Sequence, residues 1–297
     1  MDDTLGLHPL ASMLPLDRPF TRGTARAAGV ERPALERMLR TGSLRRLLRG
    51  VYAATGAPDS VEFRAAAVGL AVERDVVGMD RTAAWVHGVD LRVCGVDGLV
   101  PLDLAPGVHA RHHRRSGRQL VPRDLCTLEG ICLTTPLRTA LDVGRLFSPD
   151  RALAALDQLL AVGGFTHTQL LAELPRMAGC QGVGQLRSLA ARADARSGSL
   201  AESVLRHRWL EAELPTPTPG LRTVAGHGLV RLCLATPERQ FAVALAGQLS
   251  ADELVALEGA GWRVVVLGEE RVLQADPEVL IRHLEREFHQ QLLAQVG

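Results

Sequence analysis

The chain has 297 residues, of which 46% are hydrophobic and 23% are charged, and its formal net charge is +1. These values are typical of a globular chain of two or three domains and exclude a disordered one. No apolar run approaches the roughly 18 residues of a membrane span. The start, MDDTLGLHPLASMLPLDRPF, is acidic where a signal peptide is basic, so we expect a cytoplasmic protein.

The basic residues are unevenly distributed. All 34 of them are arginines, whose planar forked donors suit phosphate and guanine. Residues 21–50 carry a net charge of +6, because they hold only Glu31 and Glu36 against eight arginines: Arg22, Arg26, Arg32, Arg37, Arg40, Arg45, Arg46 and Arg49. The rest of the chain is mildly acidic. A basic segment joined to an acidic body is the charge pattern of a nucleic-acid-binding protein.

The segment 20–54 predicts two helices and a hairpin. Thr21 is a good N-cap for a helix through Ala28, and Pro33 fits the first turn of a second helix that ends near Arg40. SLRRLLRGVYAA then predicts two short strands around Arg49-Gly50. This order favours a winged helix-turn-helix over 1–56, with the second helix in the major groove and the hairpin on the neighbouring backbone or in the minor groove. The alternative is a small α+β subdomain with a solvated basic face.

The same segment resembles the N-terminal domain of AbiEi-like proteins, which are antitoxins and transcriptional regulators of type IV toxin–antitoxin systems. The residues that carry the resemblance are TRGTARAAG (21–29) and GSLRRLLRGVY (42–52). The resemblance implies groove contacts from Arg32, Arg37 and Arg40 and wing contacts from Arg45, Arg46 and Arg49. We add Arg22 and Ser43, which lie in the two motifs, as further candidate contacts to double-stranded DNA. Such a protein would be nucleoid-associated when bound to DNA.

Residues 57–190 predict a mixed α/β middle domain. Within it TTPLRTALDVGR (134–145) resembles a second motif of AbiEi-like proteins, one that opens a helix after the winged helix. Thr134 or Thr135 can cap this helix, and Arg138 and Asp142, four residues apart, can pair along one face. Asp80 is the expected N-cap of an earlier helix, and Gly163-Gly164 joins two later helices. We expect the motif to be structural.

A second basic cluster, HARHHRRSGR, spans 109–118. It predicts either a solvated hairpin tip or an auxiliary phosphate contact from Arg111, Arg114 and Arg115. A metal site on the nearby histidines is disfavoured, because the run offers no acidic or thiol ligand and its arginines repel a cation. The chain's five cysteines are scattered, and we expect reduced thiols and no bound metal or other cofactor.

The C-terminal part, 197–297, follows a polar linker at 191–199 and predicts a helix, three or four strands and a final helix. It resembles the very-short-patch-repair-like, restriction-endonuclease-like α/β domain that often accompanies AbiEi-like segments. Matched to that family's motifs, SLAES (199–203) keeps the glutamate Glu202, whereas Cys233, Ala244 and Ala246 stand at the other acidic positions. A divalent metal needs several oxygen ligands. This pattern therefore predicts a nuclease-like domain without its catalytic chemistry.

Three functions remain open at this stage. The first is a DNA-binding transcriptional regulator with an inactive nuclease-like domain and no enzymatic activity. The second is an antitoxin that neutralises a toxin and represses its own operon. The third is an active metal-dependent DNA endonuclease, which requires a shifted register that brings in one of Glu211, Glu213 or Glu238. The expected partners are double-stranded DNA and, beyond it, a cognate toxin or a second copy of the chain, with no role for a membrane.

Overall fold

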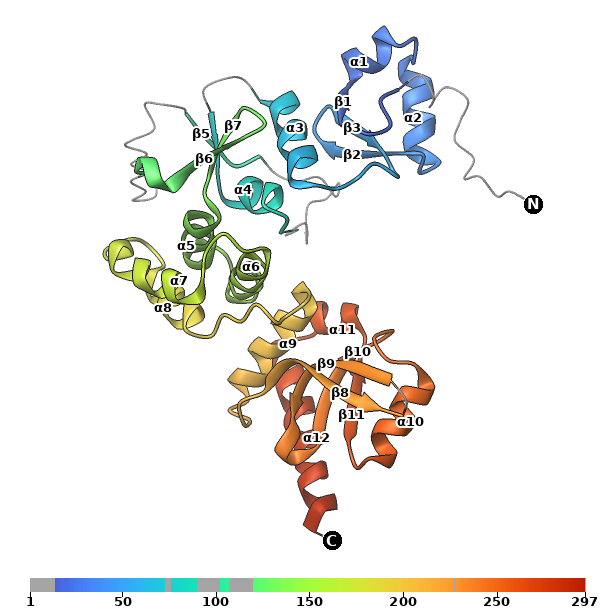
Figure 1. Cartoon of the computed structure of the whole chain (residues 1–297), viewed down its shortest axis with the longest axis vertical. Helices are drawn as coiled ribbons and strands as arrows, with labels where there is room; N and C mark the ends of the chain where they lie inside the picture. The colour runs from blue at the N-terminus through green and yellow to red at the C-terminus, as the bar shows by residue number, and fades with distance from the viewer. Residues whose placement is uncertain (1–13, 73–75, 90–101, 107–119, 227, 297) are drawn as a thin grey trace, which may run out of the picture. The chain divides into compact units, whose positions relative to one another are not determined.

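The computed structural model describes residues 14–72, 76–89, 102–106, 120–226 and 228–296 (Figure 1). The chain forms two compact units: Met1–Val143 with Met177–Gln181, and Gly144–Arg176 with Gly182–Gly297. These units do not coincide with the three predicted domains, whose boundaries stay a prediction. Within the described residues, no helix is both long and apolar enough to cross a bilayer.

The N-terminal segment folds as two short helices beside a three-stranded antiparallel sheet of order β1-β3-β2. Its elements are β1 (Phe20–Thr21), α1 (Arg22–Ala27), α2 (Arg32–Arg40), β2 (Leu44–Leu48) and β3 (Val51–Ala54). The Thr21 hydroxyl accepts from the Thr24 amide at 3.1 Å, as expected of an N-cap. Gly50, at φ +80°, completes the turn between β2 and β3. The predicted helix–helix–hairpin order is confirmed.

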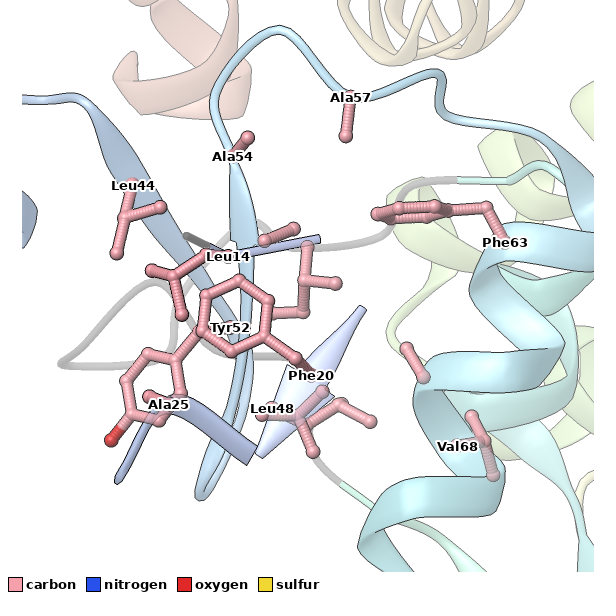
Figure 2. Packing of buried hydrophobic residues seen from close by; sticks show 14 of the residues in the cluster. Leu14, Phe20, Ala25, Leu44, Leu48, Tyr52, Ala54, Ala57, Phe63 and Val68 are labelled. Atoms are coloured by element: carbon pink, nitrogen blue, oxygen red, sulfur yellow. The ribbon is translucent and has the colours of Figure 1, made fainter. Parts of the chain in front are cut away.

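The N-terminal segment shares one hydrophobic core with the helix α3 (Val61–Ala71). Phe20 and Tyr52 lie with their ring centroids 6.2 Å apart, and α2 buries Leu35 and Met38. Figure 2 shows Phe63 and Val68 of α3 packed against this group. The sheet and its helices therefore do not close a core of their own; α3 completes it together with Trp85, Val86 and Leu133 from later elements of the chain.

The middle segment forms a four-stranded sheet of order β5-β4-β7-β6, in which only β4 and β7 are parallel. Its elements are β4 (Val76–Gly78), α4 (Asp80–Val86), β5 (Leu104–Pro106), β6 (Leu125–Leu128), β7 (Ile131–Thr134) and α5 (Pro136–Leu146). The placement of Asp80 as N-cap of α4 is wrong by one residue, since Met79 holds that position. The Asp103 carboxylate instead accepts from the Arg81 amide, at 3.1 Å, and so supplies the cap.

The TTPLRTALDVGR motif has the structural role predicted for it. Arg138 is buried and contacts Asp142 and Asp124, each at 2.8 Å. The Thr135 hydroxyl accepts from the Arg138 amide at 3.3 Å, so Thr135 rather than Thr134 caps α5. A buried guanidinium held by two carboxylates keeps the start of α5 in a fixed position against the segment before β6.

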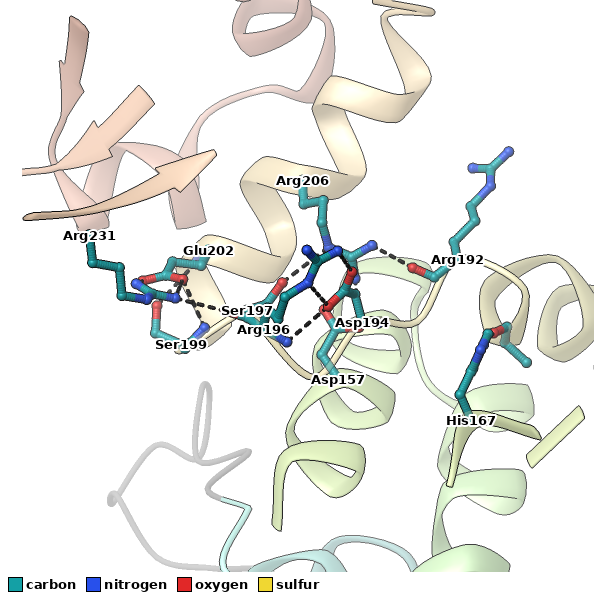
Figure 3. Close-up of polar contacts among 12 residues, drawn as sticks. Asp157, His167, Arg192, Asp194, Arg196, Ser197, Ser199, Glu202, Arg206 and Arg231 are labelled. Atoms are coloured by element: carbon teal, nitrogen blue, oxygen red, sulfur yellow. Dashed lines mark hydrogen bonds and ion pairs between the residues drawn. The ribbon is translucent and has the colours of Figure 1, made fainter. Parts of the chain in front are cut away.

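The second unit begins with four helices. They are α6 (Pro149–Val162), α7 (His167–Glu173), α8 (Val183–Ala190) and α9 (Leu200–Glu211), and Gly163-Gly164 joins the first two as predicted. The predicted linker at 191–199 is fixed in place by α6 and α9 (Figure 3). Arg206 contacts Asp157 at 2.6 Å and Ser197 at 3.0 Å, and the Asp194 amide donates to Asp157 at 2.8 Å. Residues 191–199 are therefore a packed connection, because residues of both α6 and α9 hydrogen-bond to them.

A four-stranded sheet of order β11-β10-β9-β8 completes the second unit. Its elements are β8 (Thr218–Ala225), β9 (Gly228–Thr236), β10 (Phe241–Leu245), α10 (Ala251–Gly259), β11 (Arg263–Leu267), α11 (Glu269–Gln274) and α12 (Pro277–Val296). The rings of Trp209, Phe241 and Phe288 pack together at centroid distances of 5.3 to 6.0 Å. Short 3-10 helices lie at Pro122–Asp124, Leu174–Met177 and Pro237–Arg239. The predicted helix, strands and helix are confirmed, with β8, α10 and α11 added.

Candidate nucleic-acid interface

Helix α2 separates its apolar and basic residues cleanly. Leu35 and Met38 face the core, whereas Arg32, Arg37 and Arg40 are exposed. Residues 37 and 40 lie three apart and therefore share one face. Among the residues the structure describes, none forms an ion pair or side-chain hydrogen bond with Arg37 or Arg40. No described residue therefore competes with an external anion for these two guanidiniums.

Arginines from three elements gather around Glu36. The Nε of Arg32 donates to Glu36 Oε1 at 2.7 Å. The hydrogen bond and the charge of Arg32 lower the pKa of the Glu36 carboxyl, and Arg22 of α1 and Arg46 of β2 add smaller contributions in the same direction. These contributions fall off with distance, so α1, α2 and β2 present a common positive region.

The hairpin supplies the other exposed arginines. The guanidinium of Arg46 lies over the ring of Tyr52, 5.7 Å from its centroid, and both the ring and the cross-strand register hold it there. Arg49 is exposed in the turn between β2 and β3. A charge on the tip of a short hairpin beside α2 is well placed to contact the backbone of a duplex whose groove holds the helix.

Two predicted residues in this region are engaged within the protein. Arg45 is half-buried, lies 5.7 Å from the Phe63 ring centroid and donates to the Ala57 carbonyl at 3.4 Å. Ser43 is half-buried, and its hydroxyl lies 3.2 Å from that of Thr41. Their contact with DNA stays a prediction. Arg111, Arg114 and Arg115, together with the neighbouring His109, His112 and His113, lie outside the described residues.

Two exposed arginines of the same region were not among the predicted DNA contacts. Arg26 lies in the last turn of α1, and Arg18 precedes β1. Arg26 follows Arg22 by four residues, so the two share a helix face, and this spacing was a readable signal. Arg18 falls outside the 21–50 window in which the charges were counted.

The second unit, called the C-terminal unit below, contains Glu202, the carboxylate predicted from the nuclease-like motif. Glu202 is buried in the first turn of α9, and Figure 3 shows it beside Arg231 of β9. Arg231 donates to it through both terminal amino groups, at 2.7 and 2.6 Å. The Gln248 amide and the Gly198 backbone N–H donate to it as well, each at 2.8 Å. Four donors therefore occupy this carboxylate.

These donors also set the ionisation of Glu202. Burial by itself would raise the pKa of the Glu202 carboxyl, but the hydrogen bonds and charge of Arg231, with those of Gly198 and Gln248, hold that pKa below its ordinary value. The carboxyl is thus kept ionised. Arg231 was missed by the sequence analysis, although it lies two residues before Cys233 and so on the same face of the strand.

The other positions of the predicted nuclease-like motif carry no carboxylate. Cys233 and Ala244 are completely buried, and burial raises the pKa of the Cys233 thiol far above its ordinary value. Glu211 lies at the other end of α9, about 13 Å along the helix axis from Glu202, and pairs with Arg208. Over the described part of the chain, no three His, Cys, Asp or Glu side chains form a group suited to a metal. Cys126, Cys132 and Cys233 form no disulfide within the described residues.

Two family models match the chain. Residues 16–55 match the model described as "Transcriptional regulator, AbiEi antitoxin", and residues 76–191 match the "AbiEi antitoxin C-terminal domain". The chain is AbiEi-like. The first match covers α1, α2 and the hairpin with their exposed arginines, so the positive region lies in the segment that resembles transcriptional regulators.

Relatives of this AbiEi-like chain occur in Mycobacterium tuberculosis. The uncharacterized proteins MT2308 (strain CDC 1551) and Rv2248 (strain H37Rv) are each 28% identical to it over an alignment of 272 residues, and the match covers 86% of this chain and 97% of each relative. No solved structure matches the chain. Neither family model reaches the C-terminal sheet, so the Glu202 site lies outside the AbiEi-matched segments.

Proposed function

We propose that this AbiEi-like protein is a sequence-specific transcriptional regulator that binds double-stranded DNA through an N-terminal winged helix. The observation that carries the proposal is a set of exposed arginines that form no ion pair within the described residues, inside the segment that matches an AbiEi regulator model: Arg37, Arg40, Arg46 and Arg49. An arginine whose terminal amino groups were held by internal carboxylates could not supply this binding, since it would first have to give up those partners.

The element order supports a specific docking arrangement. Helix α2 has nine residues and is therefore about 13 Å long, and the major groove admits a helix of this width. Arg37 and Arg40 would then face the groove, and Arg46 and Arg49 of the hairpin would contact phosphates. Groove contacts read the sequence, whereas phosphate contacts supply affinity that falls with salt.

The proposal is tested by fluorescence anisotropy of the full chain on a duplex from its own upstream region. A scrambled duplex of equal length is measured beside it, at two salt concentrations. We expect the upstream duplex to bind on the order of a hundredfold more tightly than the scrambled one, with both affinities falling as salt rises. Absence of binding to either duplex at low salt would overturn the proposal.

An antitoxin role is a second candidate, compatible with the first. It is favoured by the match of residues 76–191 to the AbiEi antitoxin C-terminal domain. In this case the gene product encoded beside the chain should arrest growth when expressed alone, and co-expression of the chain should restore growth. A chain carrying alanine at Arg37, Arg40, Arg46 and Arg49 separates the two roles, because rescue without DNA binding requires toxin neutralisation by the rest of the protein.

We infer further that residues 197–297 form an inactive, nuclease-like domain and that the protein is not an enzyme. The support is chemical: a divalent ion needs several oxygen ligands, and the Glu202 carboxylate already accepts from Arg231, Gln248 and Gly198. The Arg231 guanidinium supplies the positive charge that a metal would bring. Neighbouring Cys233 and Ala244 offer no carboxylate to replace the missing ligands.

A further inference from the structure

The exposed face of α2 contains one carboxylate among its arginines. The side chains of Arg32 and Glu36 are 69% and 55% exposed, so neither is needed to fill the core. A lone carboxylate beside Arg22, Arg32 and Arg46 weakens the attraction of this surface for phosphate, because it repels the DNA backbone. Such a residue contributes to binding only where it makes a contact that depends on the base sequence.

We propose that Arg32 and Glu36 form a base-reading pair, in which Glu36 holds the Arg32 guanidinium so that its two terminal amino groups meet O6 and N7 of one guanine. The proposal rests on the proposed function, since it requires α2 to enter the major groove. Glu36 is a positioning residue in this arrangement, and Arg32 is the residue that touches the base.

The hydrogen-bond pattern leaves the correct donors available. Glu36 accepts from Nε of Arg32 at 2.7 Å, which uses the side edge of the guanidinium. The end edge, with both terminal amino groups, makes no hydrogen bond to any residue in the described part of the chain. Two parallel donors in one plane match the paired acceptors O6 and N7 of guanine, which no other base presents in the major groove.

The position of the pair on the helix agrees with base contact. Arg32 is the first residue of α2, and recognition helices contact base edges mainly through their N-terminal residues. A free arginine loses rotamer entropy when it is fixed on a base, and a carboxylate one helical turn away removes part of this cost before binding. Arg37 and Arg40 lack such a support among the described residues, so their contacts are less constrained.

The experiment starts from the duplex that the wild-type chain selects from a randomised pool. Each base pair of that duplex is exchanged in turn, and the affinity of the wild type, Arg32→Ala, Glu36→Ala and Glu36→Gln is measured by anisotropy. We expect exchange of one G·C pair to weaken the wild type by about 5- to 150-fold, the range of a good bidentate contact. Arg32→Ala and Glu36→Ala should both lose this discrimination, and at the same base pair.

The control variant is Glu31→Ala, which removes the same charge from the N-cap of the same helix, where the side chain caps nothing. It should leave the discrimination at that pair unchanged. Glu36→Gln should retain part of it, because the amide oxygen still accepts from Nε. Affinity for scrambled DNA should stay or rise in both Glu36 variants, and thermal midpoints should match the wild type because Glu36 is exposed.

Two results would overturn the base-reading proposal but not the proposed DNA-binding function. The first is full discrimination between base pairs in Glu36→Ala. The second is a loss of discrimination in Glu36→Ala at a base pair different from the one affected in Arg32→Ala. Wild-type binding without any preference for the selected duplex would overturn the proposed function itself, and the pair with it. The wild-type measurement therefore separates the two failures.

Discussion

The arginines of the N-terminal segment and those of the C-terminal unit have opposite environments. Arg37, Arg40 and Arg49 are exposed and make no ion pair within the described residues, whereas Arg206 and Arg231 are bound to buried carboxylates. The chain has no lysine, so this difference owes nothing to residue type. Partner and burial decide whether an arginine holds the fold together or remains available for a ligand.

The two environments also predict different consequences of mutation. Removing one partner of a buried pair leaves an uncompensated charge, which is strongly destabilising. Removing an exposed arginine costs the fold little, because its charge is already solvated. Stability measurements should therefore respond to the C-terminal arginines, and DNA-binding measurements to the N-terminal ones.

The largest effect is expected for Asp157→Ala. Asp157 is completely buried and holds Arg206, itself 4% exposed, so its loss should lower the free energy of unfolding by about 3–5 kcal/mol. Urea denaturation followed by circular dichroism measures the change. Asp194→Ala is the matched control on the neighbouring loop, because its partner Arg196 is mostly exposed and the pair is worth at most about 1 kcal/mol. Equal losses in the two variants would remove the distinction between the two kinds of arginine.

The next largest effect is expected for Glu202→Gln, which should lower the free energy of unfolding by about 1.5–3 kcal/mol near neutral pH. The lower part of this range is expected because Arg231 is 35% exposed and partly screened by water. Urea denaturation at a series of pH values measures both this cost and its pH dependence.

The pH dependence follows from the lowered pKa of the Glu202 carboxyl, whose ordinary value is 4.5. Its contribution to stability is complete above about pH 4.5 and is lost as the pH falls through the folded-state pKa. Stability curves of wild type and Glu202→Gln should therefore converge in acid. Glu211→Gln, in the same helix but exposed, is the control, and a gap that widens in acid would contradict the assignment.

Substitution of the exposed arginines is expected to change DNA affinity. Arg37→Ala or Arg40→Ala should weaken specific binding by about 1–3 kcal/mol where the residue reads a base. Arg46→Ala or Arg49→Ala should weaken all duplexes alike and reduce the salt dependence, because they contact phosphate. Anisotropy titrations at several salt concentrations distinguish the two. If none of the four changes binding, the winged-helix proposal is wrong.

Strand β2 contains both kinds of arginine, so Arg45→Ala compares an internally bonded arginine with its exposed neighbour. Arg45 packs on Phe63 and bonds to Ala57, whereas the adjacent Arg46 is exposed. We expect Arg45→Ala to lower the thermal midpoint while leaving the salt slope of DNA binding at its wild-type value. A reduced slope with an unchanged midpoint would place Arg45 on the DNA-contacting surface with its neighbour.

The smallest effect is expected from metal ions. Millimolar Mg²⁺ or Mn²⁺ should leave the thermal midpoint unchanged and should produce no cleavage of plasmid DNA, because the donors around Glu202 fill the carboxylate. Gel electrophoresis of plasmid incubated with the chain is the measurement. Metal-dependent cleavage that disappears in Glu202→Gln would contradict the inactive-domain proposal directly.

Most local elements could be predicted because their signals are local. Thr21, Pro33 and the Arg49-Gly50 turn set helix ends and a hairpin through their own backbone chemistry. Strand β8 was missed because Pro217 and Pro219 indicate a loop. At the edge of the sheet, however, a proline costs no hydrogen bond on its outward side. The short helix α10 was missed although Ser250 and Glu253 form a capping box at its start.

The sites were harder to predict because they depend on contacts distant in sequence. The partners of Glu202 come from β9 and from the loop after β10, so Arg231 and Gln248 reach it only once the sheet has formed. The net charge of residues 21–50 located the positive region, but the sequence predicted DNA contacts for Arg45 and Arg46 alike. The burial of Arg45 and its contacts with Phe63 and Ala57, which come from residues distant in sequence, separate it from the exposed Arg46.

The negative charge of Glu202 is neutralised by Arg231, a side chain of the same protein. A counter-ion drawn from solution leaves when its concentration falls, whereas a guanidinium tethered to the same chain stays at a fixed high local concentration. Dialysis and chelators should therefore leave this part of the protein unaffected. Above the pKa of Glu202, this carboxylate therefore keeps its counter-charge as long as the sheet itself remains folded.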